Sequence, residues 1–127
     1  MKKKQDDISE MMINGVRFVR EDSIAAQTMA NVDGLDYVIV RGDRSGVFAG
    51  YLESRDGREV TLIDCRRIWY WDGAASISQL AIDGTSAPDK CKFPAPVQKI
   101  EILDAIEVIP CTDGAMVSIK GVSIWQK

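Results

Sequence analysis

The strongest constraint on the fold is a strand–turn–strand pattern at residues 45–71, SGVFAGYLESRDGREVTLIDCRRIWYW. Its Asp56-Gly57 step is typical of a tight β-hairpin, because glycine tolerates the positive φ that such turns require. The β-branched and aromatic residues on both sides favour two antiparallel strands. Gly46 and Gly50 interrupt the first strand, which predicts a bend or the close approach of another backbone. This pattern favours a strongly curved antiparallel meander over a flat sheet.

The segments around this hairpin add further strands. Residues 16–19 and 36–42 each predict a strand, from their alternation and their β-branched content. Residues 99–110, KIEILDAIEVIP, predict one strand with alternating apolar residues facing inward, ending at Pro110. The last residues, VSIWQK, predict a strand or an extended tail.

Short helices are also indicated. Residues 22–31 predict one helix, and residues 112–121 predict another that starts at Thr112. Residues 73–84 fit either a helix capped near Ser76 or a strand edge, and the sequence leaves this open. The segment 85–98 holds three of the four prolines and predicts a loop.

The chain length of 127 residues is that of one domain with one core. We expect a single α+β domain over residues 1–127, with a curved antiparallel β-meander, one or two short helices and a frayed terminus at residues 1–10. No window approaches the roughly 18 apolar residues of a membrane span. The charged start lacks the apolar region of a secretory signal. We therefore expect a cytoplasmic protein without a membrane partner.

The sequence contains no histidine, which removes the commonest general base and the commonest metal ligand. The three cysteines are widely spaced and form no C-x-x-C pair, so neither a zinc site nor a disulfide framework is indicated. A binding protein with no metal or cofactor is therefore favoured over an enzyme. The net charge of −3 argues against a protein that coats duplex nucleic acid.

One candidate site is the loop in VRGDRSGVFAG, residues 40–50. Arginine presents a planar fork of donors that suits phosphate oxygens, and small residues expose backbone N–H groups. The alternative is an ordinary β-turn with solvated arginines. The candidate phosphate-binding residues of this loop are Arg41, Arg44, Ser45 and Gly46.

The second candidate is CRRIWYW, residues 65–71. On a strand, Arg67, Trp69 and Trp71 would share one face, and Arg66 and Tyr70 would share the other. An aromatic ring beside an arginine can hold a nucleobase by stacking and cation–π contact. The alternative places Trp69 and Ile68 in the core, with Trp71 or Tyr70 at its rim.

The third candidate is DKCKFP, residues 89–94, in the proline-rich loop. Lys92 and Phe93 would form a basic, aromatic lid over an anionic ligand. The alternative is a surface loop that Phe93 anchors by packing inward.

The stretches RRIWYWDGAAS, CKF and IPCT resemble a family of small proteins encoded by phages and prophages. We identify this family with the Thoeris anti-defence sponge proteins. The resemblance implies a phage protein that sequesters a cyclic ADP-ribose immune signal, and in some members cyclic oligonucleotides, without turnover. It also implies a homo-oligomer (a dimer or a hexamer) in the host cytoplasm, with ligand pockets at subunit boundaries. The site residues rest on the chemistry above: Arg41, Arg44, Ser45 and Gly46 for phosphates, Trp69 or Trp71 with Phe93 for stacking, and Arg66, Arg67 and Lys92 for further charge.

A second resemblance is to the Sm-like proteins. GVFAGYLESRDGREVTLIDCRRI is similar to their first motif, part of a curved barrel, and MVSIKGVSIW loosely resembles the second. It implies a ring that binds single-stranded RNA by stacking bases on aromatic side chains. The long segment between the motifs and the lack of clear acidic and asparagine ligand positions count against it. A third interpretation is that the aromatic residues form a protein–protein interface.

Overall fold

A computed structural model describes residues 29–126 of the chain. The predicted frayed terminus at 1–10 and the predicted strand at 16–19 lie outside this range. Only the last three residues of the predicted helix at 22–31 lie inside it, and they are not helical. Met29 forms an isolated bridge with Thr112, and Asn31 begins a strand.

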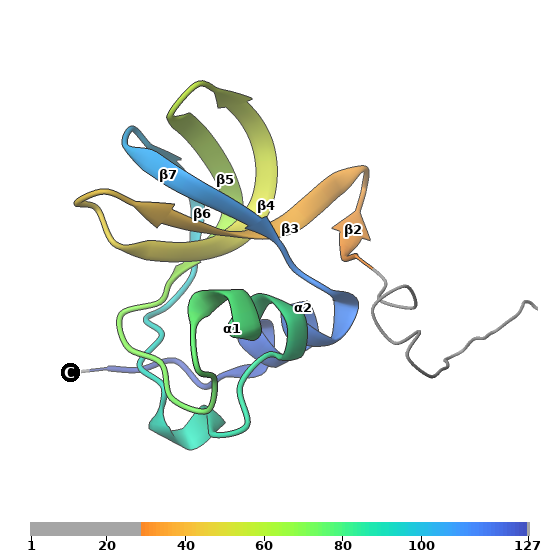
Figure 1. Ribbon diagram of the computed structural model, residues 1–127, viewed down its shortest axis with the longest axis vertical. Coiled ribbons are helices and arrows are strands. Elements are labelled where there is room, and N and C mark those ends of the chain that lie inside the picture. Colours follow the sequence, from red (N-terminus) through yellow and green to blue (C-terminus); the bar gives the residue numbers. More distant parts are fainter. Residues whose placement is uncertain (1–28, 127) are drawn as a thin grey trace, which may run out of the picture.

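The described chain forms an antiparallel six-stranded sheet and two short α-helices, which confirms the predicted α+β class. Neighbouring strands follow the order β2-β3-β4-β5-β6, and β7 returns to pair with β3. Figure 1 shows the strongly bent sheet, with both helices grouped beneath one end of it. The elements are β2 (Asn31–Val32), β3 (Leu35–Gly42), β4 (Val47–Asp56), β5 (Glu59–Arg67), α1 (Ile77–Asp83), the 3-10 helix η2 (Pro88–Lys90), β6 (Val97–Ile102), β7 (Ala105–Pro110) and α2 (Asp113–Gly121).

The hairpin predicted at residues 45–71 is present as β4 and β5, joined at Gly57 with a φ of 62°. The predicted bend is also present, because the β4–β5 register shifts between Ala49 and Tyr51. A Cβ atom on Gly50 would lie 3.1 Å from the Cα of Cys65, so only glycine fits this approach without displacement. Opposite it, Asp64 has a φ of 50°. These features bend the sheet around its inner face.

The prediction of one strand at residues 99–110 is wrong. The chain bends at Leu103 and Asp104, so β6 pairs with β5 while β7 pairs with β3. The bend is fixed from both sides: the Asp104 carbonyl accepts from the N–H of Asp43 (2.8 Å), and the N–H of Ala105 donates to the carbonyl of Arg58 (3.0 Å). Both partners are distant in sequence from residues 103–105. The apolar alternation of residues 99–110 continues through this position, so it gives no sign of the corner.

The two helices begin where their capping residues predict. The Ser76 hydroxyl accepts from the N–H of Gln79 (3.2 Å), so residues 77–83 are helical, and the strand alternative is wrong. The Thr112 hydroxyl accepts from the N–H of Ala115 (3.1 Å) and donates to the carbonyl of Ile82 (2.6 Å). This second bond connects the start of α2 with the end of α1.

The buried side chains form two clusters. One lies within the bent sheet and includes Val40, Phe48 and Leu62. The other lies between the sheet and the helices and includes Leu80 and Phe93. No helix within residues 29–126 is long and apolar enough to cross a membrane.

Candidate functional site

The clearest candidate site is formed by three segments that are distant in sequence and meet beside the helices. Tyr70 and Lys92 form an isolated antiparallel bridge, with N–H···O distances of 2.8 and 3.3 Å. Phe93 and Ile124 form a parallel bridge, and the N–H of Trp125 donates to the Phe93 carbonyl at 3.0 Å. We call Tyr70, Lys92 and Trp125 the Lys92 cluster.

The ammonium group of Lys92 lies close to two aromatic rings. Its Nζ is 5.7 Å from the centroid of the Tyr70 ring and 5.6 Å from that of the Trp125 ring. Both distances are within the range of cation–π attraction. Lys92 and Tyr70 are exposed, so the ammonium can still offer donors to a solute. The cluster thus combines a positioned cation with aromatic surface, as an anionic planar molecule requires.

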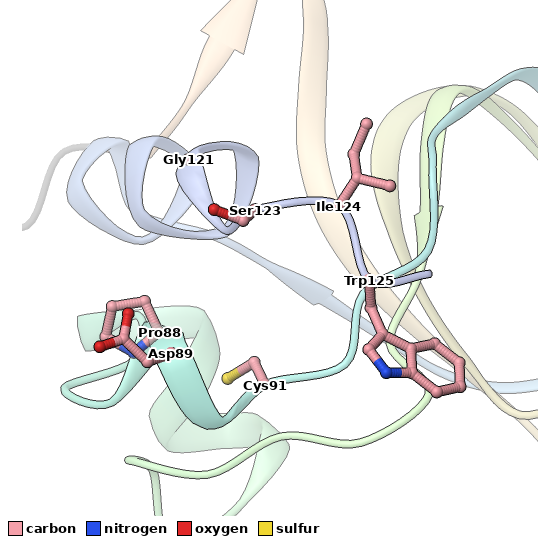
Figure 2. Close-up of a pocket in the computed structure, with 7 residues that line it drawn as sticks. All are labelled: Pro88, Asp89, Cys91, Gly121, Ser123, Ile124 and Trp125. Atoms are coloured by element: carbon pink, nitrogen blue, oxygen red, sulfur yellow. The ribbon is translucent and has the colours of Figure 1, made fainter. Parts of the chain in front are cut away.

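A pocket of about 430 Å³ adjoins this cluster, and Trp125 belongs to both. Figure 2 shows Cys91 between Asp89 and Trp125, with Gly121, Ser123 and Ile124 across from it on the segment that leads to Trp125. The Asp89 carboxylate can accept hydrogen bonds, and the Ser123 hydroxyl can donate or accept them. The complete lining is Pro88, Asp89, Cys91, Gly121, Ser123, Ile124 and Trp125.

The two tryptophans of the CRRIWYW stretch differ in environment. Trp69 is 64 % exposed, so the alternative that placed it in the core is wrong. Ile68 is buried, as that alternative expected. Trp71 packs against the helix-side core, and its Nε1–H donates to the carbonyl of Ala74 at 3.3 Å. Trp69 therefore offers a free aromatic surface, whereas Trp71 supports the fold.

The loop predicted to bind phosphate already holds an anion of the protein itself. The carboxylate of Asp104 accepts from the N–H groups of Arg44 (2.7 Å) and Ser45 (3.1 Å) and from the Ser45 hydroxyl (2.5 Å). The Ser45 hydroxyl and these amides hold the pKa of Asp104 below its usual range. The backbone N–H groups and the Ser45 hydroxyl that we assigned to a phosphate are therefore used to bind the β6–β7 corner.

Arg41 and Gly46 of this loop also have partners within the protein. Arg41 forms an exposed ion pair with Glu107, with Nε and Oε1 2.6 Å apart. The carbonyl of Gly46, at a φ of 110°, accepts from the N–H of Gly42 at 2.8 Å. The side chain of Arg44 is exposed. In this structure the loop corresponds to the turn that we considered as its alternative.

Arg66 and Phe93 lie inside the protein, so neither presents a surface to a ligand. Arg66 is only 4 % exposed, and its guanidinium donates to backbone carbonyls of Phe93, Pro94, Ile119 and Val122. Burial lowers the pKa of this guanidinium from its ordinary value. Phe93 is fully buried and anchors its loop, as the alternative for that loop expected.

Arg67 lies apart from the Lys92 cluster. Its guanidinium carbon is 4.5 Å from the centroid of the Phe48 ring, and its Nη1 donates to the Ser45 carbonyl at 2.8 Å. The structure thus brings the predicted residues together in two groups, Arg67 with the 41–46 loop and Lys92 with Arg66 and Phe93, and it places Trp69 and Trp71 in neither. The site assignment from sequence missed Tyr70 and Trp125, because the bridges that position them join segments with no local pattern in common.

Comparison with known proteins gives one result. A search of curated proteins and a search of solved structures find no match to this chain. A model of the family described as "Domain of unknown function (DUF6948)" matches residues 35–119. The matched region runs from the start of β3 into α2 and covers more than half of the chain. The chain therefore belongs to the DUF6948 family.

Proposed function

We propose that this protein captures an anionic, planar small molecule, a signalling nucleotide, at the Lys92 cluster and the adjoining pocket, without chemical turnover. The observation that carries this proposal is the exposed Lys92 ammonium between the Tyr70 and Trp125 rings, at the edge of a pocket that Trp125 also lines. A charged donor beside aromatic faces matches the two chemical features of a nucleotide, its phosphate and its base.

Different residues of the site would contact different parts of the nucleotide. Lys92 would donate to phosphate oxygens, and the Trp125 ring would stack on the base, which contributes about 1–3 kcal/mol. Asp89 and Ser123 line the pocket and can bond to ribose hydroxyls or to amino groups of the base. Trp69 adds an exposed ring on the same chain stretch as Tyr70.

A protein that binds a nucleotide without turnover needs aromatic rings and charged donors but no general base. This agrees with a sequence that places aromatic and basic residues together and contains no histidine. It also agrees with the resemblance to phage sponge proteins, from which we infer a cyclic ADP-ribose isomer or a cyclic oligonucleotide as the ligand class. On the same basis we propose a homo-oligomer in the host cytoplasm, where such a signal is made. Binding at a subunit boundary would give the exposed Trp69 a second surface to contact.

A direct binding screen tests the proposal. The purified protein is titrated by calorimetry with cyclic ADP-ribose isomers and with cyclic di- and trinucleotides, and the bound compound is recovered by heating and weighed by mass spectrometry. We expect saturable binding of at least one compound and its recovery with unchanged mass. A folded protein that binds none of them contradicts the proposal, and a chemically altered product contradicts capture without turnover.

A second candidate is the binding of single-stranded RNA, as the Sm-like resemblance implies. The observation in its favour is the β4–β5 hairpin in a strongly bent sheet, with the exposed Trp69 just beyond it. Against it, residues 116–121 of the second resembling stretch lie in helix α2. Gel shifts with short single-stranded RNA at several salt concentrations distinguish RNA binding from nucleotide capture, because RNA binding weakens steeply as the salt concentration rises.

A further inference from the structure

Arg66 connects two backbone segments that carry the Lys92 cluster. Its Nη2 donates to the carbonyl of Phe93 (2.7 Å), the residue after Lys92. Its Nη1 donates to the carbonyl of Val122 (2.6 Å), shortly before Trp125, and to that of Ile119 (3.1 Å) in α2. One buried guanidinium therefore holds the 92–94 segment and the end of α2 against each other.

The third segment of the cluster, which carries Tyr70, follows Arg66 directly in the chain. Tyr70 follows four residues later along the chain and bridges Lys92 through the backbone. The guanidinium carbon of Arg66 also lies 5.5 Å from the centroid of the Phe93 ring. Arg66 therefore contacts or adjoins every segment that brings Tyr70, Lys92 and Trp125 together.

We propose that Arg66 is the positioning residue of the Lys92 cluster: its guanidinium fork fixes the carbonyls of Phe93 and Val122 and so sets Trp125 beside Lys92. This inference depends on the proposed function only in that the proposed function gives the Lys92 cluster a ligand. The geometric relation between Arg66, Lys92 and Trp125 can be tested without a nucleotide.

The chemistry of arginine explains why this residue type stands here. Its planar fork offers five N–H donors in fixed directions, so one side chain can satisfy carbonyls of two segments together. A lysine ammonium is a compact donor on a flexible stem and cannot span both sides with the same geometry. The Ile119 carbonyl also accepts from the N–H of Val122 (3.3 Å), whereas the Val122 carbonyl lies just past the helix, where carbonyls have no partner within the helix.

The test uses Trp125 as a reporter. Trp69 and Trp71 are replaced by phenylalanine, so that all tryptophan fluorescence comes from Trp125, and folding is checked by circular dichroism. Quenching is measured with iodide and with neutral acrylamide at constant ionic strength. Lys92 should attract iodide to Trp125, so Lys92→Gln should lower iodide quenching by about twofold and leave acrylamide quenching unchanged.

Arg66→Lys is then compared with Arg67→Lys in the same background. Arg67 is a matched control, since its guanidinium contacts Phe48 and Ser45 instead of the cluster. We expect Arg66→Lys to raise acrylamide quenching by about twofold and to abolish the iodide preference, because a local opening separates Trp125 from Lys92. A folded Arg66→Lys protein with the quenching of Arg67→Lys would overturn the proposal.

Amide hydrogen exchange of the unsubstituted protein provides a measurement that does not depend on a variant's folding. The N–H of Trp125, bonded to the Phe93 carbonyl, should exchange about 100-fold more slowly than in an unstructured peptide if the segment is held in place. Exchange at the peptide rate would overturn the proposal. If quenching and exchange behave as expected but no nucleotide binds, the role of Arg66 stands and the proposed function fails.

Discussion

The Nζ of Lys92 lies 5.6 Å from the centroid of the Trp125 ring, although the two residues come from different loops on either side of β6, β7 and α2. Tyr70 approaches the same ammonium from a third segment. The backbone bridges Tyr70–Lys92 and Phe93–Ile124 hold these segments together, and the Arg66 guanidinium bonds to the carbonyls behind them. The cluster is thus built on the core instead of on one surface loop.

The exposed ring of Trp69 provides the first prediction. Trp69→Ala should weaken nucleotide binding by about tenfold, a typical loss for one stacking contact, while the free energy of unfolding changes by less than about 0.5 kcal/mol. Leu103→Ala is the control, because it removes a similarly exposed apolar side chain at the β6–β7 corner. Calorimetry measures the nucleotide affinities, and urea denaturation measures the free energies of unfolding. Equal affinities of the two variants would exclude Trp69 from the site.

Cysteine labelling reports on the pocket. Burial raises the pKa of the Cys65 and Cys111 thiols to about 12, so at pH 8 both stay in the unreactive thiol form. Cys91 lines the pocket and should react first with N-ethylmaleimide, as peptide mass spectrometry would show. A bound nucleotide should slow this labelling. Labelling of Cys65 or Cys111 at the same rate as Cys91 would contradict the arrangement.

The Asp104 carboxylate makes the stability of the 43–46 loop depend on pH. Its pKa is lowered in the folded protein, so its contribution to stability is present above the unfolded pKa of about 4 and is lost as pH falls through the folded value. Asp104→Asn should therefore lower the melting temperature at neutral pH, and the difference from wild type should shrink in acid.

Ser45→Ala tests the cause of this shift. Its hydroxyl is the largest contributor to the lowered pKa of Asp104, so its removal should move the acid loss of stability to higher pH. A melting-temperature difference for Asp104→Asn that stays constant from neutral pH to pH 2 would show that the carboxylate charge plays no part.

Alanine substitution should have opposite effects on stability at two glycines, Gly50 in the bend of β4 and Gly114 in α2. Gly50→Ala should destabilise the protein by about 1–3 kcal/mol, because the new Cβ would lie 3.1 Å from the backbone of Cys65 and Ile63. Gly114→Ala should stabilise it by about 0.5–1 kcal/mol, because it lies in α2 with nothing within 4 Å of the new Cβ. Urea denaturation measures both, and equal effects would contradict this account of the bend.

Local signals in the sequence predicted much of this fold. The Asp56-Gly57 turn located the β4–β5 hairpin, Gly50 located the bend, and Thr112 located the start of α2. These features depend on backbone conformation within a few residues, which residue type controls directly. The corner at Leu103–Asp104 depends instead on contacts with Asp43 and Arg58, so the regular apolar alternation alone predicts one strand.

The site was harder to predict than the fold, for the same physical reason. The 44–45 amides and the Arg66 guanidinium have the chemistry of phosphate donors, but a remote carboxylate occupies the amides and remote carbonyls occupy the guanidinium. Lys92 could be selected from its basic, aromatic loop. Its partner Trp125 could not, since their proximity results from the packing of segments distant in sequence.

The most direct test of the central claim is calorimetric titration of wild type, Lys92→Gln and Lys99→Gln with the cyclic nucleotide panel. Lys99 is an exposed lysine on β6 that pairs with Glu53, so Lys99→Gln makes the same charge change away from the cluster. We predict that wild type and Lys99→Gln bind a nucleotide with equal affinity and that Lys92→Gln binds it at least about tenfold more weakly, a loss of about 1.4 kcal/mol. Failure of the wild type to bind, or equal binding by all three proteins, would contradict the claim.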